Sequence, residues 1–499
     1  MPSKIHLIAV ADLHFVSDRN YQCPGGHRQT SLGLEFLSRV LFRIRNNPPD
    51  ALVLLGDFGD KPDLASATSD LQEIVSLVRQ TKIPAVMVRG NHDLPEKDFL
   101  AIAEDLARPK IVSGFVLYPF HDLYRADETC LRPRETLNNL EKFCLENPTR
   151  PVVALQHNIV WPLLEVGYPM NLANSQEIAD TYQKLPVCLS LSGHYHVGVP
   201  LQVYQGVFYL TAPAVCELPF SYLEVVLRAD KSVEVKQPAL SNNVSLPDVH
   251  CHTEFAYCGT TVRANLAIER ARMFNCSRQV LTEHTTQLYV SPEEFSQTIF
   301  MKKPDLIRKC REEKRDRMEN FLTTMKKLRS DFVLLGGEVE LDYHQNITLL
   351  PEDQENFDLL LGAIHWLPEE ALNQGNRLLE KSFLSACERL CHSGIQILAH
   401  PFRIFRRYKL PIPTHLYPKV ADILIQTGVA AEINFHTNQP DPKFFLVCLE
   451  KGGKLALGTD AHCLEEAGDL SRHLDFLTNH LGLTEFDTAI FQPERKVYF

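Results

Sequence analysis

Histidines and acidic residues recur through the first half of the chain in short groups that can each supply metal ligands. The groups are Asp12-Leu13-His14, Gly56-Asp57, Gly90-Asn91-His92-Asp93, His157 and Gly193-His194-Tyr195-His196. Imidazole and carboxylate ligands suit borderline and hard divalent metals such as Zn, Mn and Fe. Two such ions that share a carboxylate can clamp a phosphate ester and activate a hydroxide, so the pattern indicates phosphoester hydrolysis.

A second set of histidines and carboxylates occupies the other half of the chain. Alternate residues of a strand point to the same face, so His250 and His252, like Asp12 and His14, can present two ligands together. A lone histidine usually has a structural role, but here several directly follow apolar runs. The sequence therefore predicts a second metal centre, drawn from His250-Cys251-His252, His284, Glu338, His365, His400, Glu432 and Asp460-Ala461-His462.

Short apolar runs precede these groups and predict the buried strands that position them. In the first half, strands are predicted at Ile5–Ala11, Ala51–Leu55, Ala85–Val88, Val152–Leu155 and Leu189–Ser192, and helices at Leu32–Arg45 and Ser69–Arg79. In the second half, strands are predicted at Val280–Leu281, Phe332–Leu335, Ile395–Ala399, Ala430–Ile433 and Leu455–Gly458. Such alternation indicates α/β domains, in which ligands at the carboxyl ends of strands meet at one edge. The repetition in the second half fits a barrel of parallel strands.

Length and composition favour a protein of two large domains. The chain has 499 residues, and the polar stretch Gln237–Pro247 indicates a linker, so we expect domains at 1–238 and 248–499 with 239–247 between them. The formal net charge of −11 argues against a generally basic nucleic-acid-binding surface but leaves a local basic groove open. The charged segment Lys302–Arg329 has helical spacing and predicts one solvated helix rather than a nucleic-acid contact.

The sequence also carries information about the compartment. The first residues lead straight into Asp12 and His14 without a small-residue cleavage site, so no signal peptide is expected. No stretch approaches the roughly 20 apolar residues of a membrane span, so we expect no membrane partner. The 13 cysteines are odd in number and contain no CxxC pair, which predicts free thiols in the cytoplasm. Nothing in the sequence indicates an oligomeric state.

The groups of the first half, taken in order, resemble the motifs of the calcineurin-like metallophosphoesterase family over roughly residues 1–235. The resemblance implies a β-sandwich flanked by helices (αββα) and a site for two divalent ions of Mn, Fe or Zn. It also implies that His92 is the general acid or stabilises the leaving oxygen. One ion is expected at Asp12, His14, Asp57 and His196, and the other at Asp57, Asn91, His157 and His194.

Two neighbours of this first site each have two possible roles. Asp60 either pairs with His92, which would raise the imidazole pKa and keep it protonated, or is a turn residue. Arg28 lies in the loop after the first group, where it either contacts substrate phosphate or is solvated.

The groups of the second half resemble the PHP (polymerase and histidinol phosphatase) family over roughly residues 246–499. The resemblance implies a distorted (β/α)7 barrel, phosphoesterase chemistry and two or three divalent ions. Glu338 would bridge two of the ions, and Glu432 would be an additional ligand. The other implied ligands are His250, His252, His284, His365, His400, Asp460 and His462.

The second half departs from the PHP pattern at two places. The family usually shows Thr-Asp-His where this chain has Thr282-Glu283-His284. An acidic residue that often follows the first motif is replaced by Tyr257-Cys258-Gly259, so a ligand is either missing or supplied by Glu254. Two ions rather than three then become possible. Arg403 and Arg406, just after His400, either bind substrate phosphate or form a basic surface turn.

Together these patterns predict a bifunctional metal-dependent phosphoesterase that hydrolyses phosphodiester and/or phosphomonoester bonds through a metal-activated hydroxide. The two domains are expected to act in sequence, from diester to monoester to alcohol, on a small nucleotide or sugar phosphate. One alternative is a nuclease with an end-trimming phosphatase, whose partner would be nucleic acid. Another is a second domain that serves only as a binding or regulatory module.

Overall fold

The computed structural model describes residues 4–24, 26–228, 230, 232–367 and 376–496. Contacts divide the chain into two compact units, Met1–Leu240 and Ser241–Phe499. The linker expected at 239–247 spans this division. Within the described ranges, no helix is long and apolar enough to cross a membrane.

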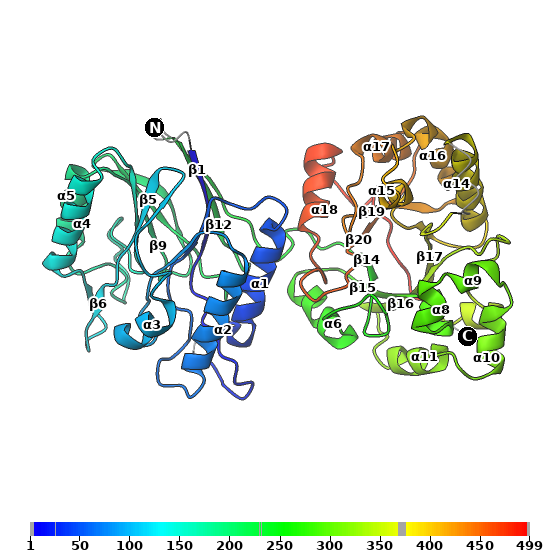
Figure 1. Ribbon diagram of the computed structural model, residues 1–499, viewed down its shortest axis with the longest axis horizontal. Coiled ribbons are helices and arrows are strands. Elements are labelled where there is room, and N and C mark those ends of the chain that lie inside the picture. Colours follow the sequence, from blue (N-terminus) through cyan, green and yellow to red (C-terminus); the bar gives the residue numbers. More distant parts are fainter. Residues whose placement is uncertain (1–3, 25, 229, 231, 368–375, 497–499) are drawn as a thin grey trace. The chain divides into compact units, whose positions relative to one another are not determined.

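The described part of the N-terminal unit contains two large sheets (Figure 1). The first has the strand order β13 (Val233–Lys236), β12 (Leu223–Arg228), β1 (Lys4–Val10), β2 (Ala51–Leu54) and β3 (Ala85–Met87). The second has the order β10 (Val199–Tyr204), β11 (Val207–Thr211), β9 (Val187–Ser192), β8 (Val152–Leu155), β5 (Phe115–Pro119) and β4 (Lys110–Val112). A separate pair consists of β6 (Leu123–Tyr124) and β7 (Cys130–Leu131). The helices are α1 (Gly33–Ile44), α2 (Ala67–Gln80), α3 (Glu96–Ala103), α4 (Arg134–Glu146) and α5 (Ser175–Lys184).

Alternate residues along the strands of this unit face two different cores. Leu117 of β5 and Leu7 of β1 belong to a core that both sheets share. The next residue on β5, Val116, belongs to another core with Leu137 of α4 and Ile178 of α5. A strand that is buried on both faces reads as a continuous apolar run, which explains why these strands could be found in the sequence. The predicted β-sandwich with flanking helices is confirmed.

The C-terminal unit is built on seven parallel strands, and the sheet curls into a nearly closed barrel. The strand order is β14 (Asp248–Cys251), β15 (Gln279–His284), β16 (Val333–Val339), β17 (Leu359–Gly362), β18 (Ile397–Leu398), β19 (Ala430–Asn434) and β20 (Leu455–Gly458). The first and last strands approach each other where Asp460 N donates to the His250 carbonyl oxygen at 2.6 Å. The predicted (β/α)7 barrel is confirmed.

Side chains inside the barrel form their own small core, separate from the outer one. Val249, Leu334, Ile397 and Ala456 belong to this inner cluster, whereas the larger outer cluster joins the strands to the helices. The longer helices are α6 (Ala264–Met273), α11 (Met318–Lys326), α14 (Asn376–Cys391), α16 (Tyr417–Thr427) and α17 (Pro442–Glu450). The shorter ones are α7 (Thr285–Tyr289), α8 (Pro292–Ser296), α9 (Ile299–Lys302), α10 (Leu306–Glu312), α12 (Pro351–Gln354), α15 (Arg403–Arg407) and α18 (Ser471–Asp475).

The prediction of one solvated helix over Lys302–Arg329 is wrong. Helix α9 ends at Lys302, two helices, α10 and α11, lie within the stretch, and Phe321 and Met325 of α11 are fully buried. Pro304 separates α9 from α10 because proline has no backbone N–H to donate. Lys314, with a φ of 53°, lies between α10 and α11 in the left-handed region.

Candidate metal centres

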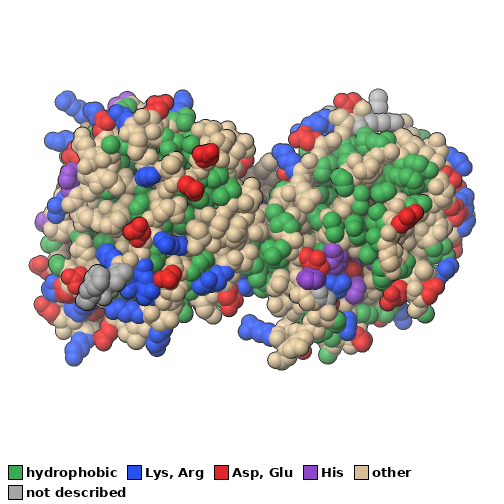
Figure 2. All heavy atoms as spheres, turned by 180° about the vertical axis from the view of Figure 1, so that it is seen from behind, with side chains coloured by type: hydrophobic (Ala, Val, Ile, Leu, Met, Phe, Trp, Pro, Cys, Tyr) green, Lys and Arg blue, Asp and Glu red, His purple; other side chains and the backbone are tan. Residues whose placement is uncertain are grey.

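The predicted ligands of the N-terminal unit all follow the carboxyl ends of strands. The structure brings them together from β1 (Asp12, His14), β2 (Asp57), β3 (Asn91, His92), β8 (His157) and β9 (His194, His196). Both sheets therefore contribute to one site. Figure 2 shows histidine and acidic side chains gathered on one face of this unit.

Asp57 lies between two groups of possible ligands. Its Oδ2 is 3.2 Å from His157 Nε2 and 3.7 Å from His14 Nε2. His157 Nε2 is also 3.1 Å from Asn91 Oδ1. Ligand atoms that lie about 2.1 Å from a shared tetrahedral ion are about 3.4 Å apart. The spacing on both sides of Asp57 therefore suits two ions with one carboxylate between them.

Buried atoms without partners test whether this chain fits divalent ions. Among the described residues, His14 Nε2 of the N-terminal unit and His250 Nε2 of the C-terminal unit are buried without a hydrogen-bond partner. Each such atom costs about 1–3 kcal/mol when nothing compensates it. A metal ion at each site would satisfy this atom, because His14 Nε2 faces Asp57 and His250 Nε2 faces Asp460, so the donor sets fit.

In two of the N-terminal histidines, His157 and His196, the other ring nitrogen is held by a fixed acceptor. His157 Nδ1 donates to the Leu55 carbonyl oxygen at 2.6 Å, and His196 Nδ1 lies 2.6 Å from Glu217 Oε1. Such contacts set the tautomer, so that the Nε2 lone pair faces the metal position. Glu217 was not singled out in the sequence, because it lies far from the motif that contains His196.

The ligand residues also have unusual backbone conformations. The φ angles of Asp12, His14, Asp57 and His194 are 56°, 46°, 52° and 71°. A residue other than glycine in this left-handed region costs of order 1–3 kcal/mol, and such strain concentrates at functional sites. The sharp turn at each strand end is what directs these side chains toward one another.

Burial and neighbouring charges shift the pKa values in this site. Burial lowers the pKa of His14, and burial together with His157 lowers that of His194 to about 3. Both imidazoles are therefore neutral, as a metal ligand must be. Burial alone would lower the pKa of His157, but the Asp57 carboxylate raises it to about 9. An ion that binds at His157 must therefore displace a proton.

The expected pairing of the Asp60 carboxylate with His92 does not form. Asp60 Oδ1 lies 2.9 Å from His14 Nδ1 and accepts from Arg28 at 2.8 Å, while Oδ2 accepts from the Tyr21 hydroxyl. His92 Nδ1 instead donates to the backbone carbonyl oxygen of Asp60 at 2.6 Å. Asp60 thus orients a predicted metal ligand, and Arg28 is held against Asp60 instead of lying in a solvated loop.

Asp93, the last residue of the third motif, ties two of the ligand loops together. Its carboxylate accepts from the backbone N–H groups of Asp57, Phe58 and Gly90 at 2.9, 2.7 and 2.8 Å. The sequence marked Asp93 only as part of the motif and gave it no role. Because the bonds reach both loops, Asp93 fixes the position of Asp57 relative to Gly90.

Replacing Asp93 with alanine is expected to lower the free energy of unfolding of the N-terminal unit by about 3 kcal/mol or more. Several buried N–H groups would lose their acceptor, at about 1–3 kcal/mol each. Denaturant unfolding of the full chain measures the effect. Asp105→Ala is the control, because this exposed carboxylate forms only a surface pair with Arg79 and should contribute less than about 1 kcal/mol.

The first group in the C-terminal unit lies at the barrel seam. His252 Nε2 is 2.9 Å from Asp460 Oδ1, and His250 Nε2 is 3.5 Å from the same oxygen. Glu338 Oε2 completes the group, 3.7 Å from His250 Nε2. All four side chains are buried. Two imidazoles and two carboxylates at these distances can surround one divalent ion.

The second group uses the other oxygen of Glu338. Glu338 Oε1 lies 3.1 Å from His400 Nε2 and 3.5 Å from His365 Nε2. Burial would raise the pKa of Glu338, but His284, His365 and His250 hold it well below its usual range. One carboxylate thus faces two groups of nitrogens, as Asp57 does in the N-terminal unit.

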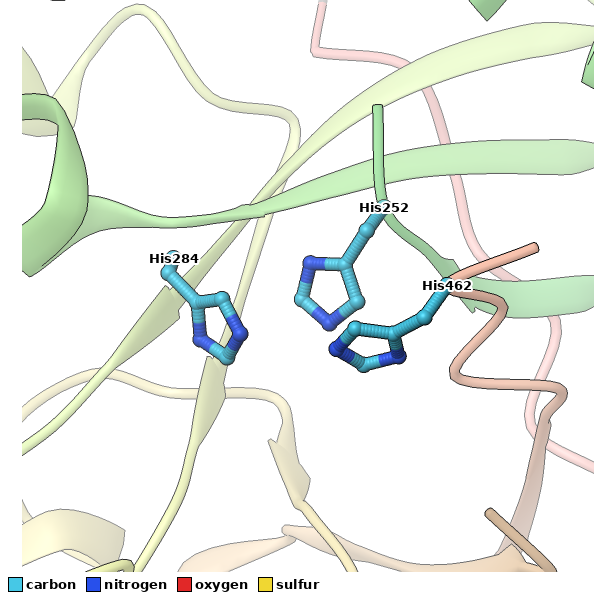
Figure 3. Close-up of side chains that lie close together, drawn as sticks. All are labelled: His252, His284 and His462. Carbon is cyan, nitrogen blue, oxygen red and sulfur yellow. The ribbon is translucent and has the colours of Figure 1, made fainter. Parts of the chain in front are cut away.

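The third group consists of His252, His284 and His462, whose rings converge in Figure 3. Each offers a nitrogen within 4.8 Å of the others. His252 comes from the end of β14, His284 from the end of β15, and His462 from the segment after β20. The histidines implied by the resemblance to the PHP family are therefore all brought to the same end of the barrel.

The structure does not support Glu432 as a ligand. Its Oε1 lies 2.7 Å from His250 Nδ1, and its Oε2 accepts from the backbone N–H of His400 at 2.6 Å. Both oxygens therefore orient predicted ligands from behind. Glu340 has the same role, since its Oε1 lies 2.7 Å from His365 Nδ1. The spacing of Glu338 and Glu340 on one strand face could have revealed Glu340.

A pocket of about 700 Å³ opens beside these groups. Arg403 reaches into the site, with Nη1 2.7 Å from Asp460 Oδ2 and Nη2 2.7 Å from His400 Nε2. Arg406 and Arg407 also line the pocket, and the Arg407 guanidinium lies 4.2 Å from the centre of the Trp366 ring. The two arginines singled out in the sequence therefore border the predicted metal ligands instead of a remote surface turn.

Comparison with known proteins assigns a family to each unit. A family model of the calcineurin-like phosphoesterases matches residues 5–198, and a PHP-domain model matches residues 248–436. No curated protein matches the sequence. Among solved structures, a dimetal phosphatase from Danio rerio has a TM-score of 0.39 and 15% identity, and covers 48% of this chain and 100% of its own. A purple acid phosphatase from yellow lupin (Lupinus luteus) seeds has a TM-score of 0.33 and 12% identity, and covers 48% of this chain and 52% of its own.

Proposed function

We propose that this chain, a metal-dependent phosphoesterase that joins a calcineurin-like phosphoesterase domain to a PHP domain, hydrolyses phosphate esters at both domains. One observation carries the proposal: each of the two sites contains a buried ligand atom that has no hydrogen-bond partner among the described residues. His14 Nε2 is such an atom in the first domain, and His250 Nε2 is such an atom in the second. A domain that only bound a ligand through its surface would not need to keep such atoms.

The proposed sites take divalent ions of Mn, Fe or Zn, two in the N-terminal domain and two or three in the PHP domain. Such ions, when bound, supply a hydroxide nucleophile and neutralise charge on the phosphoryl group. Asp57 and Glu338 are the residues placed to bridge, because each lies between two groups of ligands. The surrounding carboxylates of Asp60, Glu217 and Glu432 hold the imidazoles in orientation.

His92 is the proposed acid of the N-terminal site. Its ring centre is 4.8 Å from that of His14, at the edge of the ligand group, and its Nδ1 is engaged with the Asp60 carbonyl oxygen. Nε2 is thus the nitrogen that can face a substrate and donate a proton to the leaving oxygen. The backbone N–H of His92 donates to Asp57 Oδ1 at 2.8 Å, so this acid and the bridging carboxylate are held together.

The PHP pocket supports a small phosphorylated substrate. Arg406 and Arg407 can contact phosphate oxygens, because a planar guanidinium matches them with paired hydrogen bonds. Trp366 and Phe295 add flat apolar surfaces to the same pocket. A pocket of about 700 Å³ is of the size that encloses small ligands. A nucleotide or sugar phosphate suits this combination of charge and apolar surface.

We further propose that the domains act in sequence, with the first opening a phosphodiester and the second removing phosphate from the monoester. Joining two sites in one chain raises the local concentration of the intermediate at the second site. With bis(p-nitrophenyl) phosphate as the only phosphate compound and Mn added, phosphorus NMR should show the diester decline, the monoester rise and fall, and inorganic phosphate accumulate. Monoester that accumulates without being consumed would contradict the sequence of steps.

Removing the metals is expected to stop both steps. A chelator followed by dialysis should lower each rate at least about a thousandfold, because no residue of either site replaces the hydroxide that the ions supply. Adding Mn, Zn or Fe back one at a time should restore activity and identify the preferred ion for each step. A monoesterase rate that survives metal removal would exclude the PHP site as its source.

The nucleic-acid alternative has a different signature. A nuclease that grips several phosphates weakens steeply as salt rises, whereas a small-substrate enzyme does not. The formal net charge of −11 favours the small substrate. Measuring kcat/KM on a short DNA and on the chromogenic diester at two salt concentrations separates the two. A PHP domain that only binds or regulates would leave the monoester untouched, and its degenerate site should hold fewer ions than its ligands suggest.

A further inference from the structure

Cys258 lies on the segment after β14, beside the third group of histidines. Its Sγ is 3.4 Å from His284 Nε2, and it lines the pocket together with His284 and His462. The residue is exposed, unlike most cysteines of this chain. A sulfur atom therefore faces the same space as the imidazoles in Figure 3.

The two histidines nearest the sulfur have defined orientations. His462 Nδ1 donates to the Asp460 carbonyl oxygen at 2.6 Å, so its Nε2 keeps a free lone pair. His284 Nδ1 lies 2.6 Å from Glu338 Oε2, and its Nε2 is the nitrogen that faces Cys258. Two imidazole nitrogens and one thiol sulfur thus border a single space, on the pocket side of the first group.

The distances fit a metal that is bound by sulfur. Zinc binds thiolate at about 2.3 Å and imidazole at about 2.0–2.1 Å, so these donors are about 3.6 Å apart in a tetrahedral site. We propose that Cys258, His284 and His462 hold a divalent ion that prefers sulfur, such as Zn²⁺, with the remaining position open to the pocket. This inference rests on the proposed function in one respect: the ion would lie beside the metal group at Glu338 that the proposed function uses.

Two other residues near Cys258, Glu254 and Cys251, form contacts away from this space. Glu254, the substitute ligand considered in the sequence, accepts from the backbone N–H of Ala264 at 2.8 Å and thereby holds the start of α6. Cys251 is fully buried, and its Sγ points to the His252 carbonyl oxygen. The acidic residue of the PHP pattern is therefore replaced by the Cys258 thiolate. Soft thiolate selects Zn over Mn or Mg, so this position should discriminate among metals where the others do not.

Cobalt substitution of the full chain tests the proposal without any substrate. Metal-free protein reloaded with Co²⁺ should show near-ultraviolet sulfur-to-cobalt charge-transfer absorption. Cys258→Ser should remove this absorption and weaken the binding of one ion at least about tenfold. Even residues that only hydrogen-bond to metal ligands change metal affinity by about that factor. Cys258→Asp should keep the ion and lose the absorption. Cys463→Ser is the matched control and should change neither.

Two results would overturn the proposal. One is a wild-type spectrum without charge transfer. The other is absorption that survives in Cys258→Ser, which would assign the sulfur to another cysteine such as Cys216, which lies with His196 and Glu217. If Cys258→Ser does not fold, alkylation of the wild type decides instead. Zn²⁺ should slow the reaction of iodoacetamide with Cys258 at least about tenfold and leave Cys463 unaffected.

These measurements separate the metal site from the activity. If charge transfer appears but no phosphate ester is hydrolysed, the Cys258 site stands and the proposed function fails. If esters are hydrolysed and the spectrum lacks sulfur ligation, the function stands and Cys258 is only an exposed thiol in the pocket.

Discussion

Asp57→Ala is expected to lower kcat/KM for a chromogenic diester at least about a thousandfold, or about 4 kcal/mol of activation free energy. The Asp57 Oδ2 atom lies within 3.7 Å of both His14 Nε2 and His157 Nε2. Its removal would therefore take a ligand from both proposed ions at once, and it leaves the imidazoles without their shared carboxylate. The rate is measured on the full chain with Mn added. Monoester hydrolysis by the PHP domain can then be measured in the same sample as an internal control.

Asp57→Asn separates chemistry from folding in this test. The amide keeps an oxygen that can accept the His92 N–H, which is 2.8 Å from Asp57 Oδ1, but it loses the charge that bridges the ions. It should lose the diesterase activity without a large change in unfolding temperature. Monoester hydrolysis should stay within about twofold in both variants. If both variants still hydrolyse the diester, the diesterase activity would have to be assigned to the PHP domain.

The sequence revealed the strands and their ligands because both obey short-range rules. Ala51–Leu55 and Val152–Leu155 are continuous apolar runs, as strands buried on both faces must be. In each case a predicted ligand, Asp57 or His157, stands two residues after the run, since the carboxyl ends of strands in α/β folds meet at one edge. The structure has β2 at Ala51–Leu54 and β8 at Val152–Leu155, so these positions followed from local pattern alone.

Contacts behind the ligands could not be predicted in the same way. Asp60 was expected at His92, but its carboxylate meets His14, because the path of the loop after β2 decides which imidazole it reaches. Glu432 was expected to bind metal, but it lies behind His250 and His400. Strand alternation predicts which side of the sheet a side chain lies on. It does not predict whether the carboxylate binds the metal or contacts the second ring nitrogen of a histidine that binds the metal.

Two further differences have separate causes. The solvated helix was predicted from the density of charge in Lys302–Arg329, which outweighed the helical spacing of its apolar residues. Met318, Phe321, Leu322 and Met325 recur at the spacing of one helix face, and all four are buried. Cys258 gave no signal because its sequence neighbours show nothing of His284, which lies 26 residues later. For Cys258, a contact distant in sequence decides the role of the residue.

Glu338→Ala is expected to have the second large effect, a loss of monoester hydrolysis of at least about a thousandfold. Glu338 Oε1 lies 3.1 Å from His400 Nε2, while Oε2 lies 2.6 Å from His284 Nδ1. No other carboxylate among the described residues is placed between these groups, so removing it should also lower the metal content of the PHP domain. The measurements are kcat/KM on a chromogenic monoester and metal content per chain.

A graded series on neighbouring glutamates shows whether Glu338 acts as a bridge or only as buried structure. Glu340 lies two residues later, just past the end of β16, where it orients His365 and accepts from the Thr286 hydroxyl, so Glu340→Ala should cost about 10–100-fold. Glu352 is exposed and pairs with Arg308 at the surface, so Glu352→Ala should change nothing. Equal losses for Glu338→Ala and Glu340→Ala, with metal content unchanged, would mean that the carboxylate supports the barrel instead of the ions. The three variants lie in one domain but differ in their distance from the proposed ions. Only a metal bridge at Glu338 predicts that the loss of kcat/KM is largest for Glu338→Ala, smaller for Glu340→Ala and absent for Glu352→Ala.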